Sequence, residues 1–466
     1  MKLSKLIKGL NAEILAGNAD TEILSVCCDS RKAAEGSLFI AVSGTAADGR
    51  SFVPDALAKG AAAAVATDRA GLAALADRFY DHPSGKLKLV GITGTNGKTT
   101  TVTLLYNLFR EMGYECGLLS TIANYVGAYR EEAINTTADP VTINSLMARM
   151  VDEGCEYCFM EVSSIGVEQH RTDCLDFNVG IFSNLTHDHL DYHKTVAEYL
   201  RCKKLFFDNL PKGATAITNI DDKHGLVMVQ NTKAKVVTYS TRSGADHVCK
   251  IMEQSIDGML LKIDGIEVWT RLVGEHNAYN ILAIYSAALA LGANMDETLV
   301  GISRLQSAPG RLETIRGPQG KTVVIDYAHT PDALENVLKT LRQIEPGREL
   351  VCLFGCGGDR DRTKRPEMAA IAEQYSDRIF VTADNSRTEK TEDIMAEICT
   401  GFSPKGRTKA ICIADRAEAI RAAITLSQSP STILLAGKGH ETYQVVGTEK
   451  VHFDEHEVVA EIFKQI

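Results

Sequence analysis

The stretch LKLVGITGTNGKTTTVTLLYNLFREM, residues 87–112, decides the fold of the middle of this chain. It begins with a mainly apolar run of strand length and ends with leucines at helical spacing, Leu104, Leu105 and Leu108. Between these two parts lies the segment Gly94-Thr95-Asn96-Gly97-Lys98-Thr99-Thr100. A strand, a glycine-rich loop and a helix in this order predict a loop that binds nucleotide phosphates.

The chemistry of this loop suits an anion. Glycines let backbone N–H groups curl around phosphate oxygens, and the helix N-terminus adds partial positive charge. Lys98 can neutralise the β- and γ-phosphates, and the Thr99 hydroxyl can bind Mg²⁺. The general motif carries a further glycine where this chain has Ile92. The loop alone predicts a bound nucleotide and leaves a motor, a GTPase, a kinase and an ATP-dependent ligase open.

Strand-like and helix-like segments alternate after the loop. Residues 158–162, 179–183 and 214–218 are apolar runs of strand length, and residues 195–207 have helical spacing. This alternation predicts a mostly parallel, doubly wound α/β sheet. Residues 237–272 instead alternate apolar and polar side chains between turns, which predicts antiparallel hairpins.

Breaks rich in proline and glycine, at residues 82–85 and 309–310, divide the chain. In the first part an alanine-rich stretch at residues 55–65 predicts a helix that ends near Gly60. Strand-like runs continue to the C-terminus and predict a second α/β domain there. We therefore expect three domains: a small mixed domain at residues 1–85, a central nucleotide-binding domain at residues 86–307 and a C-terminal α/β domain at residues 308–466.

The composition is that of an ordinary globular protein, with 45% hydrophobic and 24% charged residues among 466. The formal net charge of -10 argues against a basic surface for nucleic acid. No apolar run approaches the ~20 residues that span a membrane, and Lys8 and Glu13 interrupt any signal-peptide core. The twelve scattered cysteines are expected to be reduced thiols in the cytoplasm. The lone pair Cys155 and Cys158 has no partner at zinc-finger spacing, so a metal or redox role is the minor alternative.

Polar residues follow two of the predicted strands. Glu161 ends an apolar strand, where a carboxylate faces the ligand crevice or caps the next turn. The segment at residues 187–193 holds three histidines and two aspartates, which leaves open a zinc cage or a histidine that assists Mg²⁺. Lys203, judged by itself, is expected to be a solvated or snorkelling lysine.

These segments together resemble a known family. GTNGKTT, MEVSS at residues 160–164, SNLTHDHLDYH at residues 183–193 and YLRCK at residues 199–203 resemble the central domain of the Mur ligases. Mur ligases are ATP-dependent enzymes that form amide bonds in bacterial cell-wall precursors. The resemblance runs from about Asp29 to Phe453 and is closest to the members that add the third residue of the stem peptide. It rests further on Asp29-Ser30-Arg31, Asp48-Gly49-Arg50 and the segments at residues 274–280, 309–313, 326–332, 355–361 and 437–441.

The resemblance implies a three-domain architecture with a UDP-binding N-terminal domain, a central ATPase-like domain and a Rossmann-like C-terminal domain. It implies that ATP binds Gly94, Thr95, Asn96, Gly97, Lys98, Thr99, Thr100, Asn277, Asn280, Arg311 and Asp326. It implies that Mg²⁺ is held by Thr99, Glu161, His189 and Lys203, with Lys203 carbamylated to N6-carboxylysine. Lys98, Glu161, His189 and Lys203 are then the catalytic residues, which reverses the reading of Lys203 by itself.

The resemblance also implies the substrates. UDP-N-acetylmuramoyl-L-alanyl-D-glutamate is expected to bind Ser30, Asn135, Thr136, Thr137, Ser163, Gln169 and Arg171. Its carboxylate takes the γ-phosphate to give an acyl phosphate, and the amine of an amino acid then displaces phosphate. That amino acid is expected to bind Arg360, Asn385, Arg387, Gly437 and Glu441. Domain closure would bring the two substrates together, and a monomer in the cytoplasm is expected.

The identity of the amino acid depends on Asp384-Asn385-Ser386-Arg387. Family members that use meso-diaminopimelate carry Asp-Asn-Pro-Arg, and the arginine can form a bidentate pair with the far carboxylate. This chain keeps Arg387, while Ser386 replaces the proline and leaves φ unrestrained. We therefore predict meso-2,6-diaminopimelate, with LL-diaminopimelate, lanthionine and L-lysine as alternatives. A folylpolyglutamate synthase-like ligase and a non-catalytic nucleotide-binding module are the competing classes.

Overall fold

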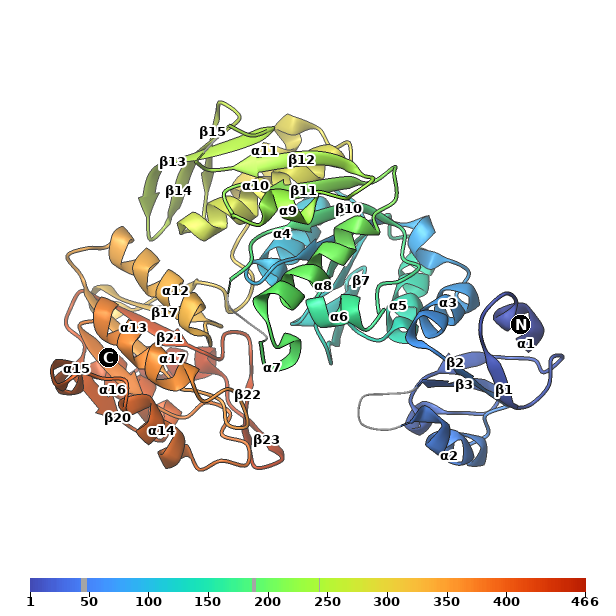
Figure 1. Ribbon diagram of the computed structural model, residues 1–466. Coiled ribbons are helices and arrows are strands. Elements are labelled where there is room, and N and C mark those ends of the chain that lie inside the picture. The colour runs from blue at the N-terminus through green and yellow to red at the C-terminus, as the bar shows by residue number, and fades with distance from the viewer. Residues whose placement is uncertain (43–47, 187–189, 243) are drawn as a thin grey trace. The chain divides into compact units, whose positions relative to one another are not determined.

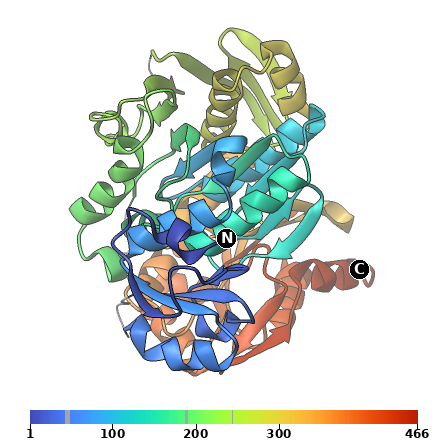
Figure 2. The same ribbon diagram turned by 90° about the vertical axis from the view of Figure 1, so that its right-hand side faces the viewer.

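The computed structural model describes residues 1–42, 48–186, 190–242 and 244–466. These residues form two compact units (Figures 1 and 2). The first unit holds Met1–Leu185, Tyr192–His247 and Ala283–Gly301, and the second holds Thr186–Asp191, Val248–Leu282 and Ile302–Ile466. The predicted N-terminal domain and most of the predicted central domain belong to the first unit, whereas residues 248–282 and the end of the central domain belong to the second. The three predicted domain boundaries therefore remain a prediction. No helix in the described ranges combines the length and apolarity that crossing a bilayer demands.

The N-terminal region is a small mixed sheet with helices. Its strand order is β1 (Glu13–Ala16), β4 (Ala63–Thr67), β3 (Ser37–Val42) and β2 (Ser25–Cys27), accompanied by α1 (Leu3–Ile7), α2 (Val53–Ala58) and α3 (Arg69–Phe79). The predicted helix at residues 55–65 is wrong in its second half, because α2 ends at Ala58. Gly60 then turns the chain with φ of 98°, and β4 pairs with β3 on one side and β1 on the other. Burial between two strands outweighs the helix propensity of alanine there.

A mainly parallel sheet forms the centre of the first unit, as the alternation predicts. Its strand order includes β12 (Lys235–Ser240), β11 (Thr215–Asn219), β10 (Phe177–Phe182), β5 (Lys88–Thr93), β9 (Tyr157–Glu161) and β6 (Cys116–Leu119). These strands run parallel, whereas β7 (Ala123–Val126) and β8 (Tyr129–Glu132) continue the edge antiparallel. The carboxyl ends of the parallel strands therefore meet at one edge, where doubly wound sheets bind ligands.

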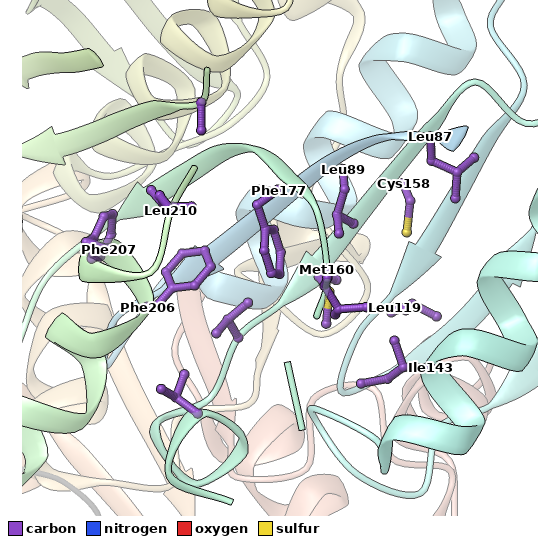
Figure 3. Packing of buried hydrophobic residues seen from close by; sticks show 14 of the residues in the cluster. Leu87, Leu89, Leu119, Ile143, Cys158, Met160, Phe177, Phe206, Phe207 and Leu210 are labelled. Atoms are coloured by element: carbon purple, nitrogen blue, oxygen red, sulfur yellow. The ribbon is translucent and has the colours of Figure 1, made fainter. Parts of the chain in front are cut away.

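Helices α5 (Pro140–Asp152), α6 (Ser164–Glu168) and α8 (Val196–Asp208) cover one face of this sheet, and α4 (Lys98–Glu111) lies on the other (Figure 1). Figure 3 shows the core beneath α8, where the rings of Phe177 and Phe206 meet edge to face at 4.9 Å. Gly91 permits this contact, because a Cβ there would lie 2.6 Å from Phe177. Cys155 and Cys158 are buried in the same core, so packing accounts for the pair.

The second unit holds the predicted hairpins and the predicted Rossmann-like sheet. Strands β13 (His247–Ser255), β14 (Gly258–Ile263) and β15 (Ile266–Thr270) pair antiparallel. The C-terminal sheet has the order β16 (Glu313–Arg316), β17 (Lys321–Asp326), β21 (Ser431–Ala436), β18 (Glu349–Phe354), β19 (Arg378–Val381) and β20 (Ala410–Cys412), parallel except for β16. One face packs on α12 (Pro331–Ile344), α13 (Lys364–Tyr375) and α14 (Thr391–Cys399), and the other on α16 (Arg416–Leu426) and α17 (Glu455–Phe463).

A histidine–carboxylate pair ties α17 to β16 and predicts a pH-dependent stability. His456 Nε2 lies 3.1 Å from Glu313 Oε1. This hydrogen bond raises the pKa of His456 from 6.5 to about 9. The pair is fully stabilising below pH 6.5, and its contribution is lost as pH rises through about 9, since the folded state then holds a proton that the unfolded state has released. We expect denaturant unfolding to show this fall in stability.

Glu313→Gln should flatten that fall. Glu457→Gln is the matched control, because it removes a pair with His452 that is largely exposed to solvent. A pH profile that Glu313→Gln leaves unchanged would contradict the assignment.

Candidate functional site

The glycine-rich loop has the geometry of an anion cradle. It joins β5 to α4, and its two glycines adopt positive φ, 156° at Gly94 and 88° at Gly97. A Cβ at Gly94 would lie 1.9 Å from Ser183 Oγ, so only glycine fits beside the neighbouring strand's end. Because Gly97 precedes the first turn of α4, the N–H groups at the start of that helix face the loop.

The loop is held in shape by its own residues and by the end of β10. Thr95 N donates to Asn184 O at 2.8 Å, and Asn96 N donates to Asn184 Oδ1 at 2.9 Å. Lys98 Nζ donates to Gly94 O and to Thr95 O, both at 2.9 Å. These hydrogen bonds fold the lysine side chain back so that its ammonium group lies against the loop. Such a preformed loop can receive phosphate oxygens with little reorganisation.

A buried carboxylate stands beside this loop. Glu161 ends β9 opposite Ile92 of β5, and its side chain is 1% exposed. Oε1 accepts hydrogen bonds at 2.8 Å from Thr99 Oγ1 and from Thr121 N, while the buried Oε2 has no hydrogen-bond partner. An unsatisfied buried carboxylate oxygen is costly, and a carboxylate with a hydroxyl is the donor set that Mg²⁺ prefers. Thr99 and Glu161 therefore fit a magnesium ion.

Lys203 reaches the same loop from α8. It is 1% exposed, and its Nζ donates to Gly94 O at 2.8 Å. The ammonium also lies 4.5 Å from the centre of the Tyr199 ring, whose hydroxyl is 3.2 Å from Thr95 Oγ1. The solvated lysine expected from the residue by itself is wrong, since burial puts the amine against the phosphate loop. His189, the fourth predicted catalytic residue, lies outside the described residues.

Three of the predicted sugar-peptide residues form a chain of hydrogen bonds that starts at the backbone of Glu161. Thr137 Oγ1 donates to Glu161 O at 2.9 Å, and Arg171 Nη1 donates to Thr137 O at 2.6 Å. Gln169 Oε1 accepts from Arg171 Nη2 at 2.7 Å. Of the remaining ones, Thr136 bonds Thr121, Ser163 caps α6, Asn135 is exposed, and Ser30 lines a separate cavity of about 620 Å³ beside the N-terminal sheet.

The second unit holds the other predicted ATP residues. On α10 (Glu275–Ala290), Asn280 Nδ2 donates to Asn277 Oδ1 at 2.9 Å, and both side chains are buried. Asp326 ends β17, and its carboxylate accepts from the backbone N–H of Leu312 and of Ala328. Burial raises the pKa of Asp326, although the neighbouring Arg311 opposes that rise.

The predicted amino-acid residues share one cavity of about 650 Å³ at the carboxyl ends of β17, β18, β19 and β21. It is lined by all five of them, Arg360, Asn385, Arg387, Gly437 and Glu441, together with Tyr327, His329, Lys364 and Asp384. Arginines and carboxylates thus face one space. A zwitterion with charged groups at both ends matches such a lining.

Lys438 is a buried cation behind this cavity that the sequence interpretation missed. Its side chain is fully buried, and Nζ lies 3.2 Å from Glu441 Oε2 and 3.5 Å from Asp384 Oδ1. Burial acts to raise the pKa of Asp384, but Lys438, Arg416, His329 and a backbone hydrogen bond together outweigh burial, so the pKa is lowered. Asn385 Nδ2 also donates to Glu441 Oε2 at 2.9 Å. The sequence feature that could have pointed to Lys438 is its position between Gly437 and Gly439.

Arg387 is held in an unusual backbone conformation. Its φ is 50°, a region that costs about 1 kcal/mol for a residue other than glycine. Arg387 N donates to Val445 O, Gly447 N donates to Arg387 O at 2.8 Å, and Nη1 donates to Gly358 O at 2.8 Å. The hairpin of β22 (Tyr443–Val446) and β23 (Glu449–His452) therefore hydrogen-bonds to the backbone of this loop. These bonds hold the conformation of the loop although position 386 is a serine and not a proline.

Comparison with known proteins tests these interpretations. Sequence models of three Mur ligase domains match this chain: the family's catalytic domain at residues 22–86, the middle domain at residues 92–288 and the glutamate ligase domain at residues 310–439. A UDP-N-acetylmuramoyl-L-alanyl-D-glutamate–2,6-diaminopimelate ligase of Phocaeicola vulgatus is 48% identical over 99% of both chains. The chain belongs to the Mur ligase family. The predicted family and its three-domain α/β fold are thereby confirmed.

Further relatives and solved structures extend the comparison. A 2,6-diaminopimelate ligase of the same name from Bacillus cereus is 40% identical over 99% of this chain and 98% of its own. A solved structure with that name matches with a TM-score of 0.72 and 30% identity over 100% of this chain and 99% of its own. Folylpolyglutamate synthase of Mycobacterium tuberculosis, complexed with ADP and AMPPCP, matches with a TM-score of 0.63 at 20% identity over 79% of this chain and 92% of its own. That last likeness concerns the fold alone.

Proposed function

We propose that this chain is the ATP-dependent ligase that joins 2,6-diaminopimelate to UDP-N-acetylmuramoyl-L-alanyl-D-glutamate. The observation that carries the proposal is the cavity in which Arg360, Arg387 and Glu441 face one space. Its relatives at 44–48% identity over nearly the whole chain bear the name of that ligase. We place the enzyme in the cytoplasm as a monomer, and we propose Mg²⁺ as its metal.

The loop residues would bind and orient the nucleotide. Gly94 and Gly97 would let backbone N–H groups face the phosphates, and the charge of Lys98 would favour phosphoryl transfer. Thr99 and Glu161 would hold the metal, which supplies charge neutralisation at the phosphate oxygens when bound. The D-glutamate carboxylate attacks the γ-phosphorus, ADP leaves, and an acyl phosphate remains.

The amine of the incoming amino acid then attacks the acyl carbon, and inorganic phosphate leaves from a tetrahedral intermediate. The residues near Glu161, above all Thr137, Gln169 and Arg171, would position the sugar-linked peptide. Arg171 is half-buried, and that burial lowers its pKa, yet the guanidinium keeps its charge and its fork of donors. Lys203 is proposed to carry a carbamate beside the loop.

The C-terminal cavity would choose the amino acid. The fork of Arg387 suits the far carboxylate of diaminopimelate, and Glu441 suits the ammonium of that same end. Asn385 and Lys438 hold Glu441 in place. L-lysine has no far carboxylate and would leave the Arg387 guanidinium without its acceptor, which costs affinity. We propose the meso isomer, because Glu441 and Arg387 together would fix both the ammonium and the carboxylate of the far end. Such a site can distinguish the configuration of the far stereocentre of diaminopimelate.

The test is to supply ATP, Mg²⁺ and the UDP-linked dipeptide with meso-diaminopimelate, LL-diaminopimelate, lanthionine or L-lysine in turn. We expect ADP release and a product whose mass has grown by one residue, with the highest kcat/KM for the meso isomer. A preference for L-lysine would contradict the substrate assignment. Product formation with folate instead of the UDP-linked dipeptide would favour the folylpolyglutamate class.

A further inference from the structure

Three metal-binding side chains of different chemistry meet outside the phosphate loop. Glu168 ends α6, His193 ends α7 (Leu190–His193) and Cys202 lies in α8. A carboxylate oxygen, a ring nitrogen and the Sγ of these residues lie within 4.8 Å of one another. Glu168 and Cys202 lie on α6 and α8, which pack together in the first unit (Figure 1), and His193 lies in the short helix that precedes α8. The packing of these helices therefore brings the three donor atoms together.

The orientation of His193 suits a ligand. Its side chain is fully buried, and Nε2 lies 2.8 Å from Ser164 Oγ. Metal-bound histidines in proteins hold their second ring nitrogen by such a hydrogen bond, which leaves the first directed at the ion. Here Nδ1 is directed toward Glu168, whose Oε2 lies 3.8 Å away.

Glu168 supplies an oxygen ligand for an ion and lies where an ion could enter from solvent. Its Oε2 is buried and has no hydrogen-bond partner, although the side chain as a whole is 34% exposed. A buried carboxylate oxygen of this kind is costly unless something positive reaches it. Cys202, by contrast, is fully buried, so an ion would enter past Glu168.

We propose that Glu168, His193 and Cys202 form a binding site for Zn²⁺ or a similar transition-metal ion, with water as the fourth ligand. A thiolate, an imidazole and a carboxylate are the donors that tetrahedral zinc takes. Mg²⁺ prefers oxygen ligands alone, so this site is chemically distinct from Thr99 and Glu161. Binding forms a sulfur–metal bond, the thiol proton goes to solvent, and nothing is oxidised or reduced.

The position of the site links it to Lys203. The His193 ring lies 5.3 Å from the Tyr199 ring, and Lys203 Nζ lies 4.5 Å from the centre of that same ring. Cys202 also directly precedes Lys203 in α8. An ion that draws His193 and Cys202 together would shift the packing around Lys203, and we expect zinc to slow the ligase. This consequence rests on the proposed function, whereas metal binding does not.

The experiment measures zinc directly on the full chain. Protein stripped with a chelator is titrated with Zn²⁺ against a chromogenic chelator, with Mg²⁺ and ADP in excess so that the phosphate loop is occupied. We expect the wild type to bind one more zinc ion than Cys202→Ala, or to bind it at least about tenfold more tightly, as ligand loss commonly costs. Cys174→Ala, which removes an exposed thiol, is the matched control and should behave as the wild type.

Cobalt gives an independent signature. Co²⁺ in the wild type should produce the near-ultraviolet absorption of a thiolate bound to cobalt, and Cys202→Ala should lose it. Glu168→Gln should weaken binding while the thiolate signal persists at higher cobalt, and it serves as the second variant if Cys202→Ala does not fold. Equal zinc binding by the wild type and Cys202→Ala, wild-type protein without a thiolate signal, or full displacement of zinc by Mg²⁺ would each overturn the proposal.

Discussion

Replacing Lys203 by alanine is expected to lower ligase turnover by about a hundredfold or more, the scale of losing one group that stabilises transition-state charge. Lys203 is buried, and its amine lies 2.8 Å from the carbonyl oxygen of Gly94 at the entrance to the phosphate loop. A carbamate at this amine would place a carboxylate at the phosphate loop, where we propose that it joins Thr99 and Glu161 as a magnesium ligand. The measurement is ADP release with the UDP-linked dipeptide and diaminopimelate.

The carbamate is separated from a plain structural role by rescue. Short carboxylic acids such as acetate should restore part of the activity of Lys203→Ala, because they can supply the missing carboxylate in the space left by the side chain. Lys204→Ala is the matched control: Lys204 is the next residue and pairs with Asp208, one turn further along α8, at 2.5 Å. Unchanged turnover in Lys203→Ala would refute the carbamate, and a loss in Lys204→Ala of the same size would assign the effect to α8 as a whole.

The sequence predicted those parts of the molecule whose signals are local. The phosphate loop depends on the order strand, glycine-rich loop and helix within a single short stretch, and Gly94 and Gly97 adopt the positive φ that the motif requires. The hairpins around Asp257-Gly258 and Asp264-Gly265 depend on turn residues between alternating strands, and they too form as predicted. In each case the residues that decide the structure are neighbours along the chain.

The predictions failed where a partner that is distant in the sequence determines the local structure or the burial of a residue. The alanine-rich residues 63–65 have high helix propensity, yet pairing with β3 and β1 makes them a strand. Lys203 was expected in solvent because its sequence neighbours do not show that α8 packs across the end of β5. Lys438 was missed for the same reason, since its partners Asp384 and Asn385 lie in a different loop. Helical spacing and turn residues carry no information about such pairings.

The choice of diaminopimelate gives the second large effect. Arg387→Lys is expected to lower kcat/KM for diaminopimelate by about 30- to 1000-fold, which corresponds to about 2–4 kcal/mol for a broken bidentate charge pair. Lysine keeps the positive charge but presents a point charge where arginine presents a planar fork. Because lysine and arginine carry the same penalty at a φ of 50°, the backbone held by the β22–β23 hairpin should persist, and the variant tests the side chain alone.

Steady-state kinetics with the meso and LL isomers measure this effect. Most of the loss in kcat/KM should come from a higher KM, with little change in kcat, because the far carboxylate does not take part in the chemistry. Arg362→Lys is the matched control, since Arg362 is 62% exposed, pairs with Glu389 and Glu397, and is absent from the cavity lining. It should stay near the wild type. If Arg387→Lys used diaminopimelate as well as the wild type, the far carboxylate would bind elsewhere, and Arg360 would become the residue to test, because it is the other arginine that lines this cavity.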